Sequence, residues 1–218
     1  IIRKQSLYGR TLKRIGDVIF SLLVLTLGSP IFILIGILVK LSSSGPVFYR
    51  GWRTGLNSIP FRIFKFRTMV VNADKNKVDS TSSNDPRITK IGRLIRKFKL
   101  DELSQLYNVF VGDMSLVGPR PNVKRETDIY TKVEKNLLKV KPGITDFSSI
   151  VFSDESEILK NVEDPDITYN QLIRPWKSRL GLFYIKKQSF LVDLIVIVLT
   201  FINIFSRRKS LFLLHITL

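Results

Sequence analysis

An uninterrupted apolar run near the start of the chain constrains its fold more than any other feature. Residues 18–39 carry no charged side chain over 22 positions. As a single α-helix this run would be about 33 Å long, enough to cross a hydrocarbon core of about 30 Å. It is too long for the apolar part of a signal peptide, and no A-x-A-like cleavage site follows it. The run therefore predicts a segment that enters a membrane.

A proline interrupts the run near its centre. Pro30 lacks a backbone N–H and would clash with the carbonyl group of Thr26 in a regular helix, and Ser29 precedes it. A spanning helix is expected to have more basic residues on one side than on the other. Here basic residues flank the run on both sides, at positions 10, 13 and 14 and at positions 40, 50 and 53. These residues leave two alternatives open, a kinked spanning anchor and a helix–break–helix that enters and leaves by the same face.

Two further segments are amphipathic or strongly apolar. Residues 190–205 are almost entirely apolar, which is short for a span and suits either a helix at the membrane interface or a buried core helix. Residues 91–98 alternate at helical spacing between an apolar face and a face of Lys and Arg. Such a helix is either a solvated surface helix or one that lies against anionic lipid headgroups.

The charge of the chain indicates an anionic partner. Its 35 Lys and Arg against 18 Asp and Glu give a net charge of +17. Nucleic acid, acidic lipid headgroups and phosphorylated small molecules all suit that charge. The absence of Cys excludes thiol nucleophiles and Cys-ligated metals, and the single His215 makes a Ser-His-Asp triad a poor candidate.

The remaining pattern predicts a mixed fold. Two short β-prone stretches, residues 45–50 and 61–68, flank turn-forming Gly, Asn, Ser and Pro residues and predict a β-hairpin. Residues 72–86 are polar and predict a loop, whereas residues 124–140 and 154–163 predict helices. The expected fold class is α+β, mostly helical with a small β-hairpin or sheet, embedded in a membrane by the N-terminal apolar run and by interfacial amphipathic helices.

Potential chemistry is concentrated at the adjacent acids Asp101 and Glu102. Apolar residues continue after them at helical spacing, which places both acids at a helix start, where acidic residues are common for reasons of helix stability alone. Five Lys and Arg residues between positions 90 and 99 precede the pair, and Arg120 follows in a Pro-flanked turn. Carboxylates among so many cations are expected to have a lowered pKa, and they can act as nucleophile or Mg²⁺ ligand.

A series of short motifs runs in order across residues 10–200. They are KRxxD from position 13, SP from 29, GPV from 45, RTG from 53, KFRTM from 65, DPRITxxG from 85, LDELxQLxNV from 100, GDMSLVGPRP from 112 and KPGIT from 141. In this order the motifs resemble the bacterial sugar transferases, the monotopic phosphoglycosyl transferases that place a sugar phosphate on a polyprenyl phosphate.

The resemblance implies a two-step transfer. Asp101 would attack the β-phosphorus of a UDP-sugar, release UMP and hold the sugar phosphate covalently. Polyprenyl phosphate, expected to be undecaprenyl phosphate, would then accept it as a lipid-linked diphosphosugar. The resemblance also implies Glu102 as the partner of Asp101 in a dyad, and Mg²⁺ as a cofactor with Asp101 as its ligand. Arg120 and Arg96 match positions that engage phosphate in the family.

Further expectations follow from the same resemblance. Lys65, Arg67 and Arg87 match basic motif positions and are predicted to bind substrate phosphate. Ser29 and Pro30 match the break of the family's re-entrant membrane helix, which favours re-entry over a span. Residues 1–41 would form this membrane region, and residues 42–218 a catalytic domain with interfacial helices at the cytoplasmic face of the bacterial inner membrane. Expected partners are the two substrates and membrane lipids, without nucleic acid, and homo-oligomerisation stays open.

The chemistry of such a transfer agrees with the shortage of histidine. UMP leaves as a stable anion and a phosphate acceptor is nucleophilic at neutral pH, so neither step depends on a general acid or base. Bringing a carboxylate against a diphosphate requires cations instead.

Two points stay open. Residues 144–149 depart from the Gly-Ile-Thr-Gly-Trp-Ala-Gln run of many members, which leaves the sugar unidentified and Asp146 as either a specificity residue or a turn residue. The charge also permits a membrane-anchored nucleic-acid-binding module or a non-enzymatic membrane scaffold. The chain has no recognised nucleic-acid motif, and a scaffold would leave the cluster of Arg, Asp and Glu residues without a purpose.

Overall fold

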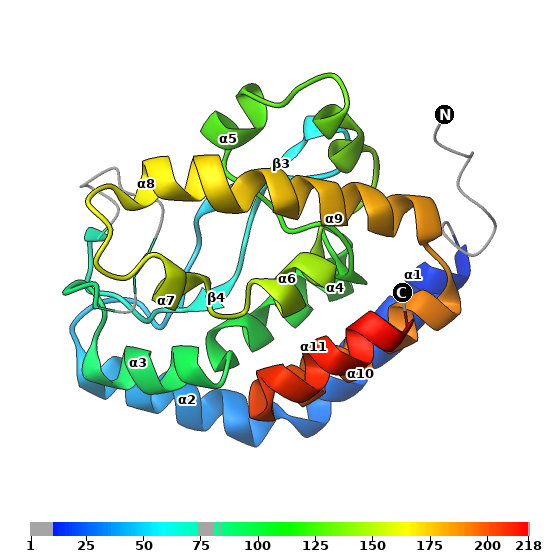
Figure 1. The fold of residues 1–218 in the computed structure, drawn as a ribbon. Coiled ribbons are helices and arrows are strands. Elements are labelled where there is room, and N and C mark those ends of the chain that lie inside the picture. The colour runs from blue at the N-terminus through cyan, green and yellow to red at the C-terminus, as the bar shows by residue number, and fades with distance from the viewer. Residues whose placement is uncertain (1–10, 74–80, 83, 218) are drawn as a thin grey trace.

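Two apolar helices that meet at a sharp bend open the described part of the chain. The computed structural model describes residues 11–73, 81–82 and 84–217, so Arg10 and much of the predicted loop over residues 72–86 lie outside it. Helices α1 (Lys13–Leu27) and α2 (Ser29–Ser42) form an angle of 64° and lie along the lower edge of the molecule in Figure 1. Among the described residues no single helix is long and apolar enough to cross a membrane, although this bent pair passes the same test jointly.

The bend lies where the sequence predicts it. Pro30 is in the first turn of α2, where a missing N–H costs no hydrogen bond, and the hydroxyl of Ser29 donates to the carbonyl oxygen of Thr26 at 2.8 Å. Gly28 approaches the preceding turn so closely that an added Cβ would lie 2.6 Å from the carbonyl oxygen of Val24. The predicted helix–break–helix is confirmed as a feature of the chain.

The predicted β-hairpin is also confirmed and consists of two paired segments. Strand β1 (Phe48–Tyr49) pairs antiparallel with β4 (Lys65–Phe66), and β2 (Trp52–Thr54) pairs antiparallel with β3 (Pro60–Arg62). The short 3₁₀ helix η2 (Leu56–Ser58) forms the turn. Because side chains alternate along a strand, Phe66 is buried against α2 and α3 while Lys65 on the opposite face of β4 faces the acidic pair.

The basic amphipathic segment forms α3 (Lys90–Lys97), which packs on α2. Its Ile95 is buried, whereas Leu94 and Phe98 remain exposed beside the basic residues. The 3₁₀ helix η4 (Leu100–Gln105) follows and continues into α4 (Leu106–Val111). This run of short helices carries the acidic pair.

The second half contains a strand pair that the sequence did not indicate. Strand β5 (Ser115–Val117) pairs in parallel with β6 (Gly143–Thr145). The other elements are α5 (Lys124–Asp128), η5 (Glu134–Lys139), α6 (Phe147–Val151), α7 (Glu155–Ile158), α8 (Pro165–Thr168), the π-helix η6 (Tyr169–Ile173), α9 (Arg174–Lys187), α10 (Phe190–Phe205) and α11 (Arg207–Thr217).

The predicted helices over residues 124–140 and 154–163 are confirmed only in part, because each segment is helical over only some of its length. Thr131 and Glu134 exchange the reciprocal hydrogen bonds of a capping box, which starts a new helix in the middle of the first segment. In the second segment only α7 is helical, and Asn161 has a positive φ of 60° that a continuing helix would not allow. Local hydrogen bonding by short polar side chains overrides the periodicity in the first case.

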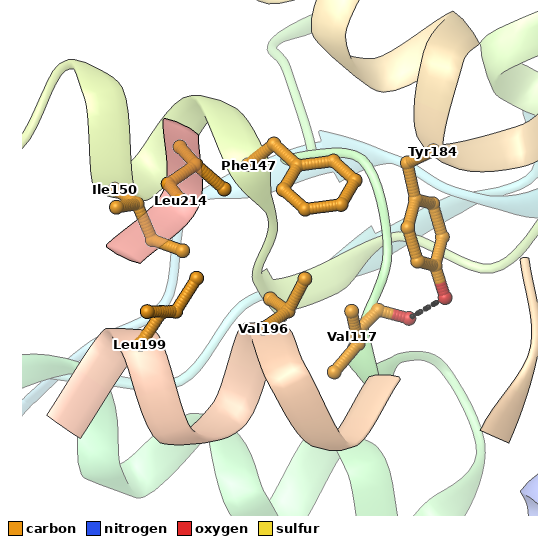
Figure 2. Packing of buried hydrophobic residues seen from close by; sticks show 7 residues of the cluster. All are labelled: Val117, Phe147, Ile150, Tyr184, Val196, Leu199 and Leu214. Carbon is orange, nitrogen blue, oxygen red and sulfur yellow. Dashed lines mark hydrogen bonds between the residues drawn. The ribbon is translucent and has the colours of Figure 1, made fainter. Parts of the chain in front are cut away.

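The largest core cluster joins the C-terminal helices to β5 and α6. Figure 2 shows its buried members, Val117, Phe147, Ile150, Tyr184, Val196, Leu199 and Leu214. The hydroxyl of Tyr184 donates to the carbonyl oxygen of Val117 at 3.1 Å, which ties α9 to the end of β5. Helix α10 buries one face in this core and leaves large apolar side chains exposed on the other, including Phe190, Leu194, Phe201 and Phe205.

The KRxxD motif on α1 attaches the bent helix pair to the rest of the molecule, and we name its three charged residues the α1 latch. Lys13 forms a buried ion pair with Asp193 of α10. Arg14 donates to the carbonyl oxygens of Val109 and Phe110 at 2.5 and 2.8 Å, at the end of α4. Asp17 accepts a hydrogen bond from the backbone N–H of Leu116 in β5 at 3.1 Å.

Candidate active site

The acidic pair lies at a sharp turn between two helices. Asp101 and Glu102 occupy the first turn of η4, which confirms the predicted helix start. Lys99 immediately before them has φ of 57°, a left-handed conformation that non-glycine residues rarely adopt. The left-handed conformation separates α3 from η4, and the charge of Arg96, in the last turn of α3, acts on Asp101.

Glu102 is held by two cations. Lys65 of β4 donates to one carboxylate oxygen at 2.9 Å, and Arg120 donates to both oxygens at 2.6 and 2.8 Å. Burial alone would raise the pKa of Glu102, but the charges and hydrogen bonds of Arg120 and Lys65 outweigh it and hold the pKa well below its usual range. Glu102 is therefore ionised and fixed in position.

Asp101 is buried beside it without such partners. Within the described ranges its carboxylate accepts no hydrogen bond and forms no ion pair, although its relative exposure is only 7%. Burial raises the pKa of Asp101, and the nearby charges of Lys65, Arg96 and Lys99 only partly offset that rise. The predicted lowering of the pKa is thus correct for Glu102 and wrong for Asp101, because Asp101 is desolvated and no donor contacts it directly.

Arg120 reaches Glu102 through a close contact between two backbone segments. The N–H of Gly118 donates to the carbonyl oxygen of Thr145 at 3.0 Å, and the N–H of Gly143 donates to that of Pro119 at 2.9 Å. A Cβ on Gly118 would lie 2.6 Å from the carbonyl oxygen of Lys141, so the contact requires glycine. The parallel pairing of β5 and β6 therefore sets the turn that carries Arg120.

The structure brings together only some of the predicted phosphate-binding residues. Lys65 and Arg120 contact Glu102, and Arg96 acts on Asp101 through its charge. The buried guanidinium of Arg67 instead donates to the carbonyl oxygens at positions 43 and 44, after the end of α2, at 2.7 and 2.6 Å. Arg87 donates to Asp85 and to the carbonyl oxygen of residue 73. Phosphate binding stays a prediction for all five residues.

Residues 144–149 lie next to this site. Asp146 caps the N-terminus of α6, where its carboxylate accepts a hydrogen bond from the N–H of Ser149 at 2.8 Å, and its charge also acts on Arg120. Asp146 thus has a local structural role as a helix cap, and a role in sugar specificity stays a prediction. A recess beside Arg120 is lined by Asp146 and by Arg174, Lys177 and Ser178 of α9. Apart from the positive charge of Arg174 and Lys177, no sequence pattern indicated these α9 residues.

The arrangement suits a divalent cation that is shared with a substrate. In the part of the chain that the structure describes, no group of three or more His, Asp or Glu residues could hold a metal by itself. Mg²⁺ usually binds to one or two carboxylates together with substrate phosphates and water. Asp101, which is buried and has no hydrogen-bond donor among the described residues, could serve as the protein carboxylate of such a site, while Glu102 is occupied by Lys65 and Arg120.

In this site one carboxylate lies among cations without a hydrogen-bond partner in the described residues, and the neighbouring carboxylate holds two of those cations in place. Such an arrangement is typical of an enzyme that acts on phosphorylated substrates. The family described as "Bacterial sugar transferase" matches residues 8–207, and the chain belongs to this family.

Curated relatives agree with this membership. The chain is 36% identical over 205 residues to the UDP-glucose:undecaprenyl-phosphate glucose-1-phosphate transferase of Escherichia coli (strain K12), covering 92% of this chain and 42% of that protein. It is 31% identical over 189 residues to an Aeromonas hydrophila protein, named UDP-N-acetylgalactosamine-undecaprenyl-phosphate N-acetylgalactosaminephosphotransferase, covering 85% of this chain and 42% of that one. The uncharacterized sugar transferase EpsL of Bacillus subtilis (strain 168) is 35% identical over 189 residues, covering 87% and 85%. The chain thus spans about two fifths of the length of the first two relatives.

Proposed function

We propose that the protein transfers a sugar 1-phosphate from a UDP-sugar to undecaprenyl phosphate and releases UMP. The names of two relatives specify undecaprenyl phosphate as the acceptor, but they differ in the sugar that is transferred. The acceptor is therefore the firmer part of the proposal, and the sugar is left to experiment.

The contrast between Asp101 and Glu102 carries the proposal. Glu102 holds Lys65 and Arg120 in place. The carboxylate of Asp101 has no hydrogen-bond partner among the described residues, so it can bind a ligand. A donor diphosphate at these cations would place its β-phosphorus near Asp101. A carboxylate oxygen of Asp101 attacks that phosphorus, the bond to the oxygen of the UMP phosphate breaks, and the electron pair leaves with UMP. A phosphate oxygen of undecaprenyl phosphate then attacks the same phosphorus and releases Asp101.

The cations of the site and a bound Mg²⁺ would together stabilise the negative charge of the diphosphate. Asp101 would hold Mg²⁺, which would neutralise negative charge on the diphosphate and make the phosphorus a better electrophile. Arg120 and Lys65 stabilise charge on the phosphate oxygens as it develops. Burial of Asp101 also keeps water away from the hydrolysis-prone acyl phosphate that would form on it.

We also propose that the bent helix pair is a re-entrant membrane helix, which lies in one leaflet at the cytoplasmic face of the bacterial inner membrane. The 64° bend and the basic residues on both sides support it, as does the exposed apolar face of α10. Residues 1–41 would enter the membrane, and residues 42–218 would form the catalytic domain. Because the chain has no Cys, single probes placed by Tyr8→Cys and Ser44→Cys can be labelled cleanly. Both should react from the cytoplasmic side, and labelling from opposite sides would establish a spanning helix instead.

The covalent step has a direct test. Purified protein mixed with Mg²⁺ and a UDP-sugar, without lipid acceptor, should release about one UMP per enzyme and gain the mass of a sugar phosphate. Asp101→Asn should do neither. Asp128→Asn is the matched control, since Asp128 is exposed on α5 and forms an exposed ion pair with Lys124. Wild-type UMP release from Asp101→Asn would remove Asp101 from its proposed role, and a panel of UDP-sugars would identify the donor.

A further inference from the structure

Gln105 is a buried polar residue without a described function. It is the last residue of η4 and its side chain is completely buried. Both amide atoms of its side chain lack a hydrogen-bond partner among the described residues. Exchanging the amide nitrogen and oxygen does not help, because neither position has a partner. An unsatisfied buried amide is unfavourable, and such groups in native proteins usually have a functional reason or a bound ligand.

The geometry of η4 places Gln105 and Glu102 on the same face of this helix. A 3₁₀ helix has three residues per turn, so side chains three positions apart lie directly above one another. Gln105 is three positions after Glu102, about 6 Å along the helix axis at a rise of about 2 Å per residue. Both side chains are long enough to span that separation. In this state the carboxylate oxygens of Glu102 are occupied by Lys65 and Arg120.

Binding of the UDP-sugar would change the hydrogen bonds that Glu102 accepts. A diphosphate brings negative charge to Lys65 and Arg120, which then divide their hydrogen bonds between Glu102 and the phosphate oxygens. A carboxylate that loses donors in a buried site is destabilised unless another donor replaces them. The side-chain amide of Gln105 has two N–H donors that lack a partner among the described residues, so it can supply the replacement.

We propose that Gln105 is a positioning residue that takes over the carboxylate of Glu102 when the donor diphosphate engages Arg120 and Lys65. This inference rests on the proposed transferase function. It explains why an unpaired amide is kept in the core of the site: its partner becomes available only in the substrate-bound state. Gln105 thereby keeps Glu102 in position while Lys65 and Arg120 form hydrogen bonds with the phosphate oxygens.

Two variants separate this role from a purely structural one. Gln105→Met keeps the length of the side chain and removes the unpaired amide, so it should be at least as stable as wild type. Its KM for the donor should be unchanged, and its kcat for UMP release should fall about tenfold. Gln105→Asn keeps an amide but leaves a cavity, so it should be less stable than Gln105→Met and yet retain more kcat. Between these two variants the order of activity is thus opposite to the order of stability.

The outcomes are distinct. If kcat follows stability across wild type, Gln105→Asn and Gln105→Met, or if Gln105→Met keeps wild-type kcat, Gln105 has only a packing role and the inference is overturned. Ser43→Ala is the matched control, because it also removes a buried unpaired polar atom, outside η4, and should leave kcat unchanged. If wild type releases no UMP from any UDP-sugar, the proposed function fails and this inference fails with it. If wild type releases UMP and Asp101→Asn does not, the variants at Gln105 test this inference alone.

Discussion

The α1 latch and the acidic pair are both clusters of buried or half-buried charges, but they differ in how completely the protein pairs them. In the latch, Lys13 is paired with Asp193, and Arg14 and Asp17 bond to backbone groups of α4 and β5. In the site, Glu102 is paired twice, whereas Asp101 and Gln105 have no side-chain hydrogen bond among the described residues.

This difference separates charges that hold the fold from charges that can receive a ligand. A fully paired buried charge resists movement, because breaking it leaves an uncompensated ion in a medium of low polarity. A buried carboxylate without donors is poorly solvated, and burial accordingly raises the pKa of Asp101. Under the proposed function, substrate and cation would supply the missing partners in the site, whereas each charged residue of the latch already has a partner.

The largest expected effect is on the latch. Asp193→Ala should lower the free energy of unfolding by about 3–5 kcal/mol, because it leaves the Lys13 ammonium buried without its partner. Chemical denaturation in detergent micelles measures this change. The double variant Lys13→Met with Asp193→Leu should recover most of the loss, since an apolar pair replaces the ion pair. Asp128→Ala, in an exposed pair, should cost less than about 1 kcal/mol. Equal losses for Asp193→Ala and Asp128→Ala would contradict the assignment of the latch.

A second comparison sets Arg67 against Arg120. Arg67→Lys should lower the free energy of unfolding by about 1–3 kcal/mol, because a lysine cannot reproduce the hydrogen bonds to several carbonyl groups at the end of α2. Its KM for the donor should not change. Arg120→Lys should mainly lower kcat/KM for UMP release, since it loses the paired hydrogen bonds to Glu102. A raised KM with wild-type stability in Arg67→Lys would instead support the predicted phosphate-binding role.

The bend that the latch anchors can be probed with two glycines. Gly28→Ala should lower stability by about 1 kcal/mol, because the new Cβ would meet the carbonyl oxygen of Val24 at 2.6 Å. Gly16→Ala, also on α1, places its Cβ in open space and should raise stability by up to about 1 kcal/mol through helix propensity. Thermal unfolding of both variants in the same detergent measures the difference, and equal effects would argue against a tightly packed bend.

The smallest expected effect concerns Glu126, which resembles Asp101 in having no side-chain hydrogen bond within the described ranges. Burial raises the pKa of Glu126, and Lys177 and Arg53 only partly oppose this. The folded state therefore binds the proton more tightly, so this contribution to stability is present below the unfolded pKa and is lost as pH rises through the folded pKa. Glu126→Gln should be more stable than wild type at pH 8 by about 0.5 kcal/mol, and the difference should vanish below about pH 4. A gain that is the same at both pH values would exclude titration of Glu126 as its cause.

Features that depend on a few neighbouring residues were predictable from the sequence alone. The bend follows from the missing N–H of Pro30, the hairpin from alternating β-prone residues around a turn, and the position of Asp101 and Glu102 from the helical spacing after them. Motif order also identified the family, which the match over residues 8–207 bears out.

Tertiary structure alone decided which charges meet. Arg120 reaches Glu102 because β5 pairs in parallel with β6, a contact between segments that are far apart in the sequence. Arg67 donates its hydrogen bonds to carbonyl groups after the end of α2, although Lys65 of the same motif faces the acidic pair. Asp101 and Glu102 are adjacent, yet their pKa values move in opposite directions, because burial and hydrogen-bond partners depend on where distant segments pack and not on which residues are neighbours in the chain.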